Sequence, residues 1–268
     1  MSTIAPPEQP VGELLRAWRE RRRLSQLDLD ASGVVSARHL SALETGRSRP
    51  TSRMILHLSE HLDVPLRERN RLLLAAGYAP AYPESALDAP GMRAVHEAIE
   101  LVLDGLRPTP ALVVDRRWDL VAANAGLAPL LDGLPPALLE PPVNVLRLAL
   151  HPDGLAGRTE NLAEWRAHLL GRLAREVDAS GDPDLAALLD ELVALPGPAG
   201  ADGGAPRWPG QVVVPLVLRH GDLVLRLMST TTVFGTPQDV TVDELAIEAF
   251  FPADADTAAA LAALDAGR

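Results

Sequence analysis

The sequence predicts an α+β protein in two parts, an all-helical N-terminal domain followed by an α+β domain with a small antiparallel sheet. Up to residue 77, apolar residues recur every three or four positions in short segments. Two hairpin patterns of β-branched and apolar residues occur only after residue 110. A stretch rich in proline and small residues at 78–91 separates the two patterns and predicts a linker.

The composition is aliphatic and excludes several classes of protein. Hydrophobic residues make up 47% of the 268 residues and aromatic residues 3%, so the core should consist of Leu, Val and Ala. The absence of cysteine excludes disulfides and thiolate chemistry. No apolar run approaches the ~18 residues that a membrane span needs, and no secretory signal pattern is present. We therefore expect a cytoplasmic protein with no membrane partner.

The charge is unevenly divided along the chain. The net charge of −11 argues against a nucleic-acid-binding protein. Residues 1–75, however, hold 12 Arg and 9 acidic residues, a net charge of +3, and the remainder carries −14. The positive charge is thus local to the helical N-terminal domain, where a DNA contact would be expected.

The N-terminal part is expected to be a flexible arm at residues 1–10 followed by five helices within 11–77. The first three helices should span 11–23, 26–32 and 37–45. The fourth should begin after Pro50-Thr51, and Asp63 should cap the fifth.

The second and third helices form a helix-turn-helix pattern. Ser25 and Ser36 each precede a helix at the N-cap position, where a serine oxygen accepts a hydrogen bond from a backbone N–H and the exposed amides suit a phosphate. Gly46 follows the third helix and can adopt a positive φ.

This stretch resembles the XRE/Cro-repressor type of DNA-binding domain. The resemblance rests on Leu24-Ser25-Gln26, Leu29, Val35-Ser36, Leu40-Ser41, Leu43-Glu44 and Gly46. Residues 36–41 and 44–50 resemble more narrowly the MmyB-like regulators, which join this domain to a PAS-like ligand-binding domain. The resemblance implies that Arg19 pairs with Glu44.

The turn between the two helices departs from that family's pattern. Asp30 and Gly33 stand where the family has small residues, and Val34 stands where it has glycine. A valine is poorly suited to a left-handed conformation. Either Gly33 takes that position through a shift of one residue, or the turn is strained.

Double-stranded DNA is the expected partner of this domain. In this class of motif the third helix enters the major groove, and Arg38 is the best candidate to read a base because a guanidinium can bond guanine O6 and N7 together. A homodimer on an inverted repeat is expected, because few side chains reach the bases. The expected DNA-binding residues are Ser25, Gln26, Ser36, Ala37, Arg38, His39, Ser41, Arg47, Ser48 and Arg49.

The second domain is expected at residues 92–252, with a C-terminal tail at 253–268 that frays or adds one helical turn. The expected elements are a helix at 92–106, a hairpin of strands 111–115 and 118–123, a helix through 162–177, and a helix capped by Asp182. A second hairpin of strands 211–218 and 223–230, its first strand covered on both faces, should turn at His220-Gly221. A final helix should follow the capping box at Thr241 and end near residue 252.

Several stretches of this domain resemble the MmyB-like ligand-binding domain, namely 148–155, 161–166, 229–237, 244–248 and 251–252. The run from Val114 to Asn124 resembles the opening hairpin of PAS domains. The resemblance implies a PAS-like fold and a small apolar effector such as a fatty acid.

An apolar cavity would suit such a tail, since each buried methylene contributes ~0.8 kcal/mol. Arg147, His151 or Arg226 could meet a carboxylate. The alternative is that the apolar residues simply fill the core. The residues expected to line the cavity are Leu127, Leu131, Leu146, Trp165, Leu169, Val214, Leu216, Leu225 and Phe234.

No catalytic constellation supports an enzyme. His57, Glu60 and His61 match the H-x-x-E-H zinc string, but they fall on a helix of a very small domain among core positions. We therefore expect no metal and no cofactor. The function expected is that of a one-component transcriptional regulator. Two alternatives remain open: an adaptor acting through protein contacts, and a haem or redox sensor using His151 or His168.

Overall fold

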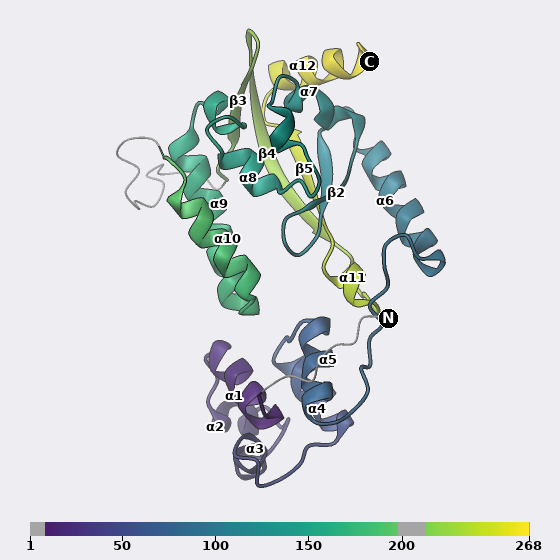
Figure 1. Ribbon diagram of the computed structural model, residues 1–268, viewed down its shortest axis with the longest axis vertical. Helices are drawn as coiled ribbons and strands as arrows, with labels where there is room; N and C mark the ends of the chain where they lie inside the picture. Colours follow the sequence, from purple (N-terminus) through teal and green to yellow (C-terminus); the bar gives the residue numbers. More distant parts are fainter. Residues whose placement is uncertain (1–8, 198–212, 268) are drawn as a thin grey trace. The chain divides into compact units, whose positions relative to one another are not determined.

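The computed structural model describes residues 9–197 and 213–267 (Figure 1). The chain divides into two compact units. The first unit comprises residues up to 85 together with the short segments 178–180 and 236–243, and the second contains the rest. Among the described residues, no helix combines the length and the apolar character needed to cross a membrane.

The first unit contains the five predicted helices. They are α1 (Val11–Arg21), α2 (Gln26–Ala31), α3 (Ala37–Glu44), α4 (Ser52–His61) and α5 (Leu66–Ala75). One leucine-rich core joins them, and its fully buried members include Leu15, Leu29, Leu40, Leu43, Ile55, Leu58, Leu72 and Leu73.

The turn between α2 and α3 follows the first of the two alternatives. Gly33 adopts φ +75°, and the N–H of Val34 donates to the carbonyl of Leu29 at 3.3 Å. Val34 packs against the helical core instead of taking the left-handed position. Asp30 accepts a hydrogen bond from the N–H of Ala37 at 3.1 Å, so this departure from the family pattern caps α3.

A buried ion pair fixes α3 against α1, as the resemblance implied. Arg19 Nε donates to Glu44 Oε1 at 2.7 Å and Arg19 Nη2 to Glu44 Oε2 at 2.9 Å, which makes the pair bidentate. The Glu44 side chain is only 3% exposed. The two helices also approach closely at Gly12, where a Cβ would lie 2.4 Å from the carbonyl oxygen of Leu43.

The start of α5 corrects the expectation that Asp63 caps it. Pro65 occupies the N-cap position and offers no side-chain hydrogen bond. The N–H of Leu66 instead donates to Asp243 Oδ2 at 3.1 Å. Asp243 ends the short helix α11 (Val240–Asp243), which belongs to the first unit although it lies 177 residues further along the chain.

The same segment is bound to the end of the linker. The N–H of Val240 donates to the carbonyl of Pro83 at 2.8 Å, and Thr241 Oγ1 donates to the carbonyl of Ser85 at 2.8 Å. Asp239 Oδ2 accepts from the N–H of Ser85 at 3.2 Å. Residues 239–243 are therefore attached by hydrogen bonds to the linker and to the helical unit, although they come from the C-terminal part of the chain.

The second unit is an α+β domain built on a five-stranded antiparallel sheet. The strands are β1 (Ala111–Val114), β2 (Leu120–Ala123), β3 (Leu216–His220), β4 (Leu223–Val233) and β5 (Ala246–Pro252), in the order β2-β1-β5-β4-β3. Its helices are α6 (Arg93–Gly105), α7 (Ala128–Leu131), α8 (Val145–Leu150), α9 (Leu162–Ser180), α10 (Pro183–Ala194) and α12 (Ala255–Ala266), with short 3-10 turns at Pro90–Met92, Ala125–Leu127, Pro136–Leu138 and Ala156–Arg158. The last turn of α9, residues 178–180, is counted with the first unit.

Both predicted hairpins are present, with one correction. β1 pairs with β2, and β3 pairs with β4 through a turn in which Gly221 has φ +59°. β3 begins at Leu216 rather than at residue 211, because Pro215 has no N–H for the ladder and Val213 is exposed. Residues 211 and 212 of the predicted strand lie outside the described part of the chain.

Two predictions for the C-terminal residues were wrong. The segment expected to be a helix up to residue 252 forms β5, in which Ile247 and Ala249 point to one face and Glu248 and Phe250 to the other. This period of two suits a strand paired on both sides. The expected tail forms α12, capped by Asp254 and anchored by Leu261, which is 3% exposed.

The sheet separates two apolar clusters. Ile247 and Ala249 pack with Ile99 and Leu103 of α6. The other face packs against α8, α9 and α10, which lie across the sheet from α6 in Figure 1. The second cluster is the larger one, and it contains the cavity described below.

We predict that Glu44→Ala will lower the free energy of unfolding by about 3–5 kcal/mol, because it leaves the Arg19 guanidinium buried without its carboxylate. Urea unfolding of the full chain measures this change. Arg16→Ala is the matched control, since Arg16 pairs with Glu20 on the surface, where water screens the pair and its removal should change the stability little. Equal losses in the two variants would contradict the role given to the buried pair.

Candidate functional site

The N-terminal turn of α3 presents a polar surface to solvent. Ser36 caps the helix, with its Oγ accepting from the N–H of His39 at 3.3 Å. Arg38 and His39 are exposed. Arg38 has no hydrogen bond or ion pair with any residue that the structure describes, so its guanidinium is available to a ligand. Ala37, beside it, is half-buried and offers only a methyl group.

The loop that follows α3 carries further basic side chains. Arg47 and Arg49 are exposed. Arg47 is held by Thr45 Oγ1 at 2.9 Å and by Ser41 Oγ at 3.4 Å, and the N–H of Ser48 donates to the carbonyl of Ala42 at 3.0 Å. This loop is therefore ordered by its own hydrogen bonds.

Arg53 was not among the predicted residues, although it is exposed in the first turn of α4. Its position directly after a loop with two arginines was the signal that could have found it.

Two of the predicted residues have partners inside the chain. Ser25 forms a capping box with Asp28, in which each side chain accepts from the other residue's N–H, at 3.1 and 2.6 Å. Gln26 Nε2 donates to Glu44 Oε2 at 2.8 Å, so Gln26 extends the buried Arg19–Glu44 pair. In the structure both side chains position the helices.

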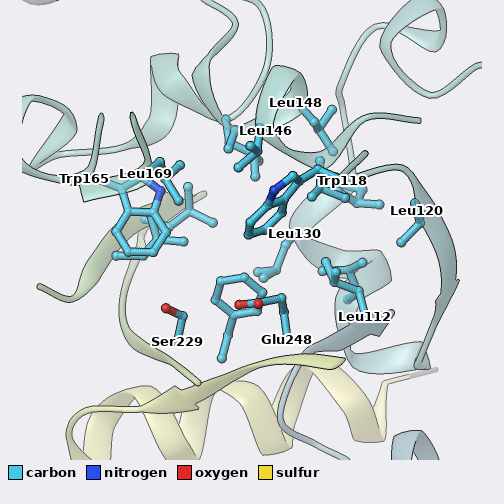
Figure 2. Close-up of a pocket in the computed structure, with 18 of the residues that line it drawn as sticks. Leu112, Trp118, Leu120, Leu130, Leu146, Leu148, Trp165, Leu169, Ser229 and Glu248 are labelled. Carbon is cyan, nitrogen blue, oxygen red and sulfur yellow. The ribbon is translucent and has the colours of Figure 1, made fainter. Parts of the chain in front are cut away.

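The second unit contains an apolar cavity between the sheet and α7, α8 and α9. The cavity has a volume of about 80 Å³. A single water needs roughly 10–15 Å³. Figure 2 shows the indole rings of Trp118 and Trp165 facing this space, with Glu248 and Ser229 on its sheet side. Its lining consists of Leu112, Trp118, Leu120, Leu127, Leu130, Leu131, Val145, Leu146, Leu148, Ala149, Leu155, Trp165, Leu169, Arg172, Leu216, Leu218, Ser229, Glu248 and Phe250.

A chain of polar contacts begins at the cavity wall, where Arg172, Glu248 and Trp118 are lining residues. Arg172 Nη2 donates to Glu248 Oε1 at 2.7 Å and Arg172 Nη1 to Glu248 Oε2 at 3.1 Å. Arg172 Nε donates to Glu176 Oε1 at 3.2 Å, and Trp118 Nε1 donates to Glu176 Oε2 at 2.8 Å. The Arg172 guanidinium also lies 4.5 Å from the centre of the Trp118 ring. Burial raises the pKa of Glu176 above its ordinary value.

Six of the nine apolar residues predicted to line a cavity do so: Leu127, Leu131, Leu146, Trp165, Leu169 and Leu216. The other three pack elsewhere. Val214 and Leu225 belong to the core beside the cavity, and Leu225 is fully buried there. Phe234 packs with the cluster on the opposite face of the sheet. These three residues fill the core, which is the alternative that the sequence left open.

The three polar residues expected to meet a ligand carboxylate lie outside the lining of this cavity. Arg147 forms an exposed ion pair with Glu191 at 2.6 Å, and the exposed Arg226 lies 3.8 Å from Asp254. His151 Nδ1 accepts from the N–H of Asp153 at 3.1 Å. None of the three lines the described cavity.

Arg172, Glu248 and Ser229 are the polar residues that sequence reasoning missed. Arg172 continues the apolar stripe of α9, three residues after Leu169, and Glu248 interrupts an apolar run. A charged residue at a position that the period assigns to the core was the available signal.

The histidines do not gather into a metal site. His57 and His61 lie on α4 with ring centroids 6.0 Å apart, beside the buried Leu58. His168 is stacked on Trp165 with ring centroids 5.2 Å apart, and it is not among the described residues that line the cavity. In the part of the chain that the structure describes, no cluster of three or more metal-ligating His, Asp or Glu occurs.

Two family models match the chain. The MmyB-like transcription regulator ligand binding domain matches residues 95–264, and a helix-turn-helix model matches residues 15–69. The match ends at residue 264 and so covers most of α12. A comparison with curated proteins found no match.

We predict that protonation of His168 lowers the stability of the protein. Burial, followed by the charges of Arg172 and Arg175, lowers the pKa of His168. Below the ordinary value of about 6.5 the unfolded chain therefore binds a proton more readily than the folded one, and stability falls as the pH falls. His168→Asn should lose less stability than the unchanged chain between pH 7.5 and 5.5, as measured by urea unfolding. An equal loss in both proteins would contradict this.

Proposed function

The chain belongs to the MmyB-like transcription regulators, and from this we propose that it binds operator DNA through α3 and adjusts that binding to a small apolar effector in the second unit. The observation that carries the DNA half of the proposal is the exposed Arg38 on the first turn of a helix whose opposite side is locked by Arg19 and Glu44. A protein acting on chromosomal DNA would work in the cytoplasm.

Base reading would rest mainly on Arg38. With α3 in the major groove, its guanidinium can bond O6 and N7 of a guanine together, while His39 and Ser41 lie on the same helix and Ala37 can contact a thymine methyl. Ser36, Arg47, Ser48 and Arg49 would contact phosphates and set the register of the helix on the duplex. Arg53 adds a further candidate phosphate contact.

A homodimer would supply the specificity that one such helix lacks. One strong base-reading side chain per α3 gives only a few base pairs of discrimination. Two copies on an inverted repeat double the number of pairs read, with the half-sites about one helical turn apart.

The apolar lining of the cavity supports an effector with an aliphatic body, such as a fatty-acid chain. Sixteen of its nineteen lining residues are apolar, and each methylene buried there contributes ~0.8 kcal/mol before the cost of ordering the chain. The strand order β2-β1-β5-β4-β3, with helices over the cavity side, supports the PAS-like interpretation of this domain.

The connection between β4 and β5 offers a route from effector to DNA. Ser229 and Glu248 line the cavity from these two strands, and the residues between the strands include 236–243, which belong to the first unit. An effector that binds one arrangement of β4 and β5 more tightly than another would shift the population of the states of that segment. Asp243, at the start of α5, and Asp239, at the end of the linker, are its points of attachment.

We predict that Arg38→Ala will weaken binding to a selected operator duplex by about 5- to 150-fold, which corresponds to the ~1–3 kcal/mol of a bidentate base contact. Fluorescence anisotropy with operator and scrambled duplexes measures the loss, and the scrambled duplex should bind almost as before. Arg93→Ala is the control, because Arg93 is a highly exposed residue of α6. A variant that keeps full preference for the operator would contradict the assignment of Arg38.

We predict that the double change Asp239→Ala and Asp243→Ala will uncouple the two units. The variant should bind operator DNA and effector separately, but the effector should change its affinity for DNA by less than half as much on a logarithmic scale. Glu97→Ala with Asp104→Ala is the control of equal charge change on α6. If the coupling persists unchanged, the segment 236–243 does not carry it.

A further inference from the structure

The polar groups of the cavity are gathered on two adjacent strands and on the helix that faces them. Ser229 lies on β4, Glu248 on β5 and Arg172 on α9. Ser229 and Thr231 share a face of β4, and Thr231 is paired in register with Glu248. Figure 2 shows Glu248 and Ser229 both on the sheet side of the apolar space. A ligand in the cavity would therefore meet its polar partners on these two strands and on α9.

The positive charge of Arg172 is already neutralised by carboxylates of the protein. Each of the three guanidinium nitrogens of Arg172 has a carboxylate partner, two with Glu248 and one with Glu176. Glu248 is 3% exposed and accepts a further hydrogen bond from Thr231 Oγ1 at 2.8 Å. Arg172 is the single cation among the described residues that line the cavity.

This arrangement disfavours a ligand with a carboxylate. To reach Arg172, the ligand would have to displace Glu248 and leave a buried carboxylate without its cation, which is strongly unfavourable. If Glu248 stays in place, the ligand carboxylate would lie beside the carboxylates of Glu248 and Glu176 in surroundings of low polarity. Burial raises the pKa of Glu176, the other carboxylate partner of Arg172.

A hydroxyl group finds both kinds of partner that it needs. Ser229 Oγ makes no hydrogen bond to any residue that the structure describes, and it can donate or accept. The two oxygens of Glu248 have about four acceptor positions, of which three are filled by Arg172 and Thr231. A ligand hydroxyl can donate to the remaining position and accept from Ser229 without disturbing the ion pair.

We propose that the effector is an uncharged aliphatic molecule carrying a hydroxyl group, held by Ser229 and Glu248, and that the Arg172–Glu248 pair excludes fatty-acid carboxylates. This rests on the proposed function, in which the cavity holds the effector. The proposed effector has a neutral hydroxyl group where a fatty acid has its carboxylate. The buried Arg172–Glu248 pair is the feature that selects the neutral ligand.

The test compares 1-decanol with decanoate, which have the same chain and differ in the polar end. Titration of the full chain, followed by tryptophan emission because Trp118 and Trp165 line the cavity, gives both affinities. We expect 1-decanol to bind at least about tenfold more tightly than decanoate. Decanoate binding as tightly as 1-decanol, or more tightly, would overturn this inference while leaving an apolar effector site in place. If neither compound binds, the effector site of the proposed function falls as well.

Two variants test which residues distinguish 1-decanol from decanoate. Ser229→Ala should weaken 1-decanol binding by about three- to tenfold through the loss of one hydrogen bond. Thr230→Ala is the control and should leave 1-decanol binding unchanged, because Thr230 is exposed on the other face of β4. Glu248→Gln removes the carboxylate partner of two guanidinium nitrogens of Arg172 and should bring decanoate to an affinity at least equal to that of 1-decanol. Circular dichroism confirms that each variant is folded. If Glu248→Gln does not fold, the unchanged chain and the Ser229→Ala variant still decide between the two outcomes.

Discussion

The need to neutralise a charge where it is buried shapes both units of this protein. A glutamate with almost no access to water needs a cation beside it, and the cation must then stay in place. In the first unit this pair is Arg19 and Glu44, and in the second it is Arg172 and Glu248. The first pair lies behind α3, the helix that we propose contacts DNA, and the second lies at the wall of the cavity.

The first pair explains how so small a unit can present a fixed surface. α3 has eight residues, and an isolated helix of this length is not stable in water. Its orientation comes from Leu40 and Leu43 in the core and from Glu44, held by Arg19 and Gln26. The side chains of Arg38 and His39 are exposed and are not needed to hold α3 in place. Both are therefore available for contact with bases.

The helical unit could be predicted well from the sequence because its signals are local. Caps, the leucine period and glycines such as Gly33 and Gly46 act within a few residues. Asp243 as the partner of Leu66 could not be found in this way, since it lies 177 residues away. β5 was mistaken for a helix because the spacing of Thr241 and Glu244 matches a capping box. Thr241 instead lies inside the short helix α11 and donates to the carbonyl of Ser85, and pairing with β1 and β4 makes the residues that follow a strand.

The cavity shows the same limit. Apolar residues such as Leu146 and Trp165 could be assigned to it from their period, but the period does not distinguish a lined cavity from a filled core, as Leu225 illustrates. The polar wall was missed because Arg172 and Glu248 are 76 residues apart, and each looks like an isolated exception to an apolar pattern. Only the fold brings the two exceptions together.

The central claim is that an occupied cavity changes the affinity for DNA. The most direct measurement titrates a labelled operator duplex with the full chain, in the presence and absence of whichever of 1-decanol and decanoate binds more tightly, with occupancy followed by tryptophan emission. The account predicts that the dissociation constant for DNA shifts at least about fivefold when the cavity is filled, the lower end of typical allosteric coupling. Identical binding curves at full occupancy would contradict it.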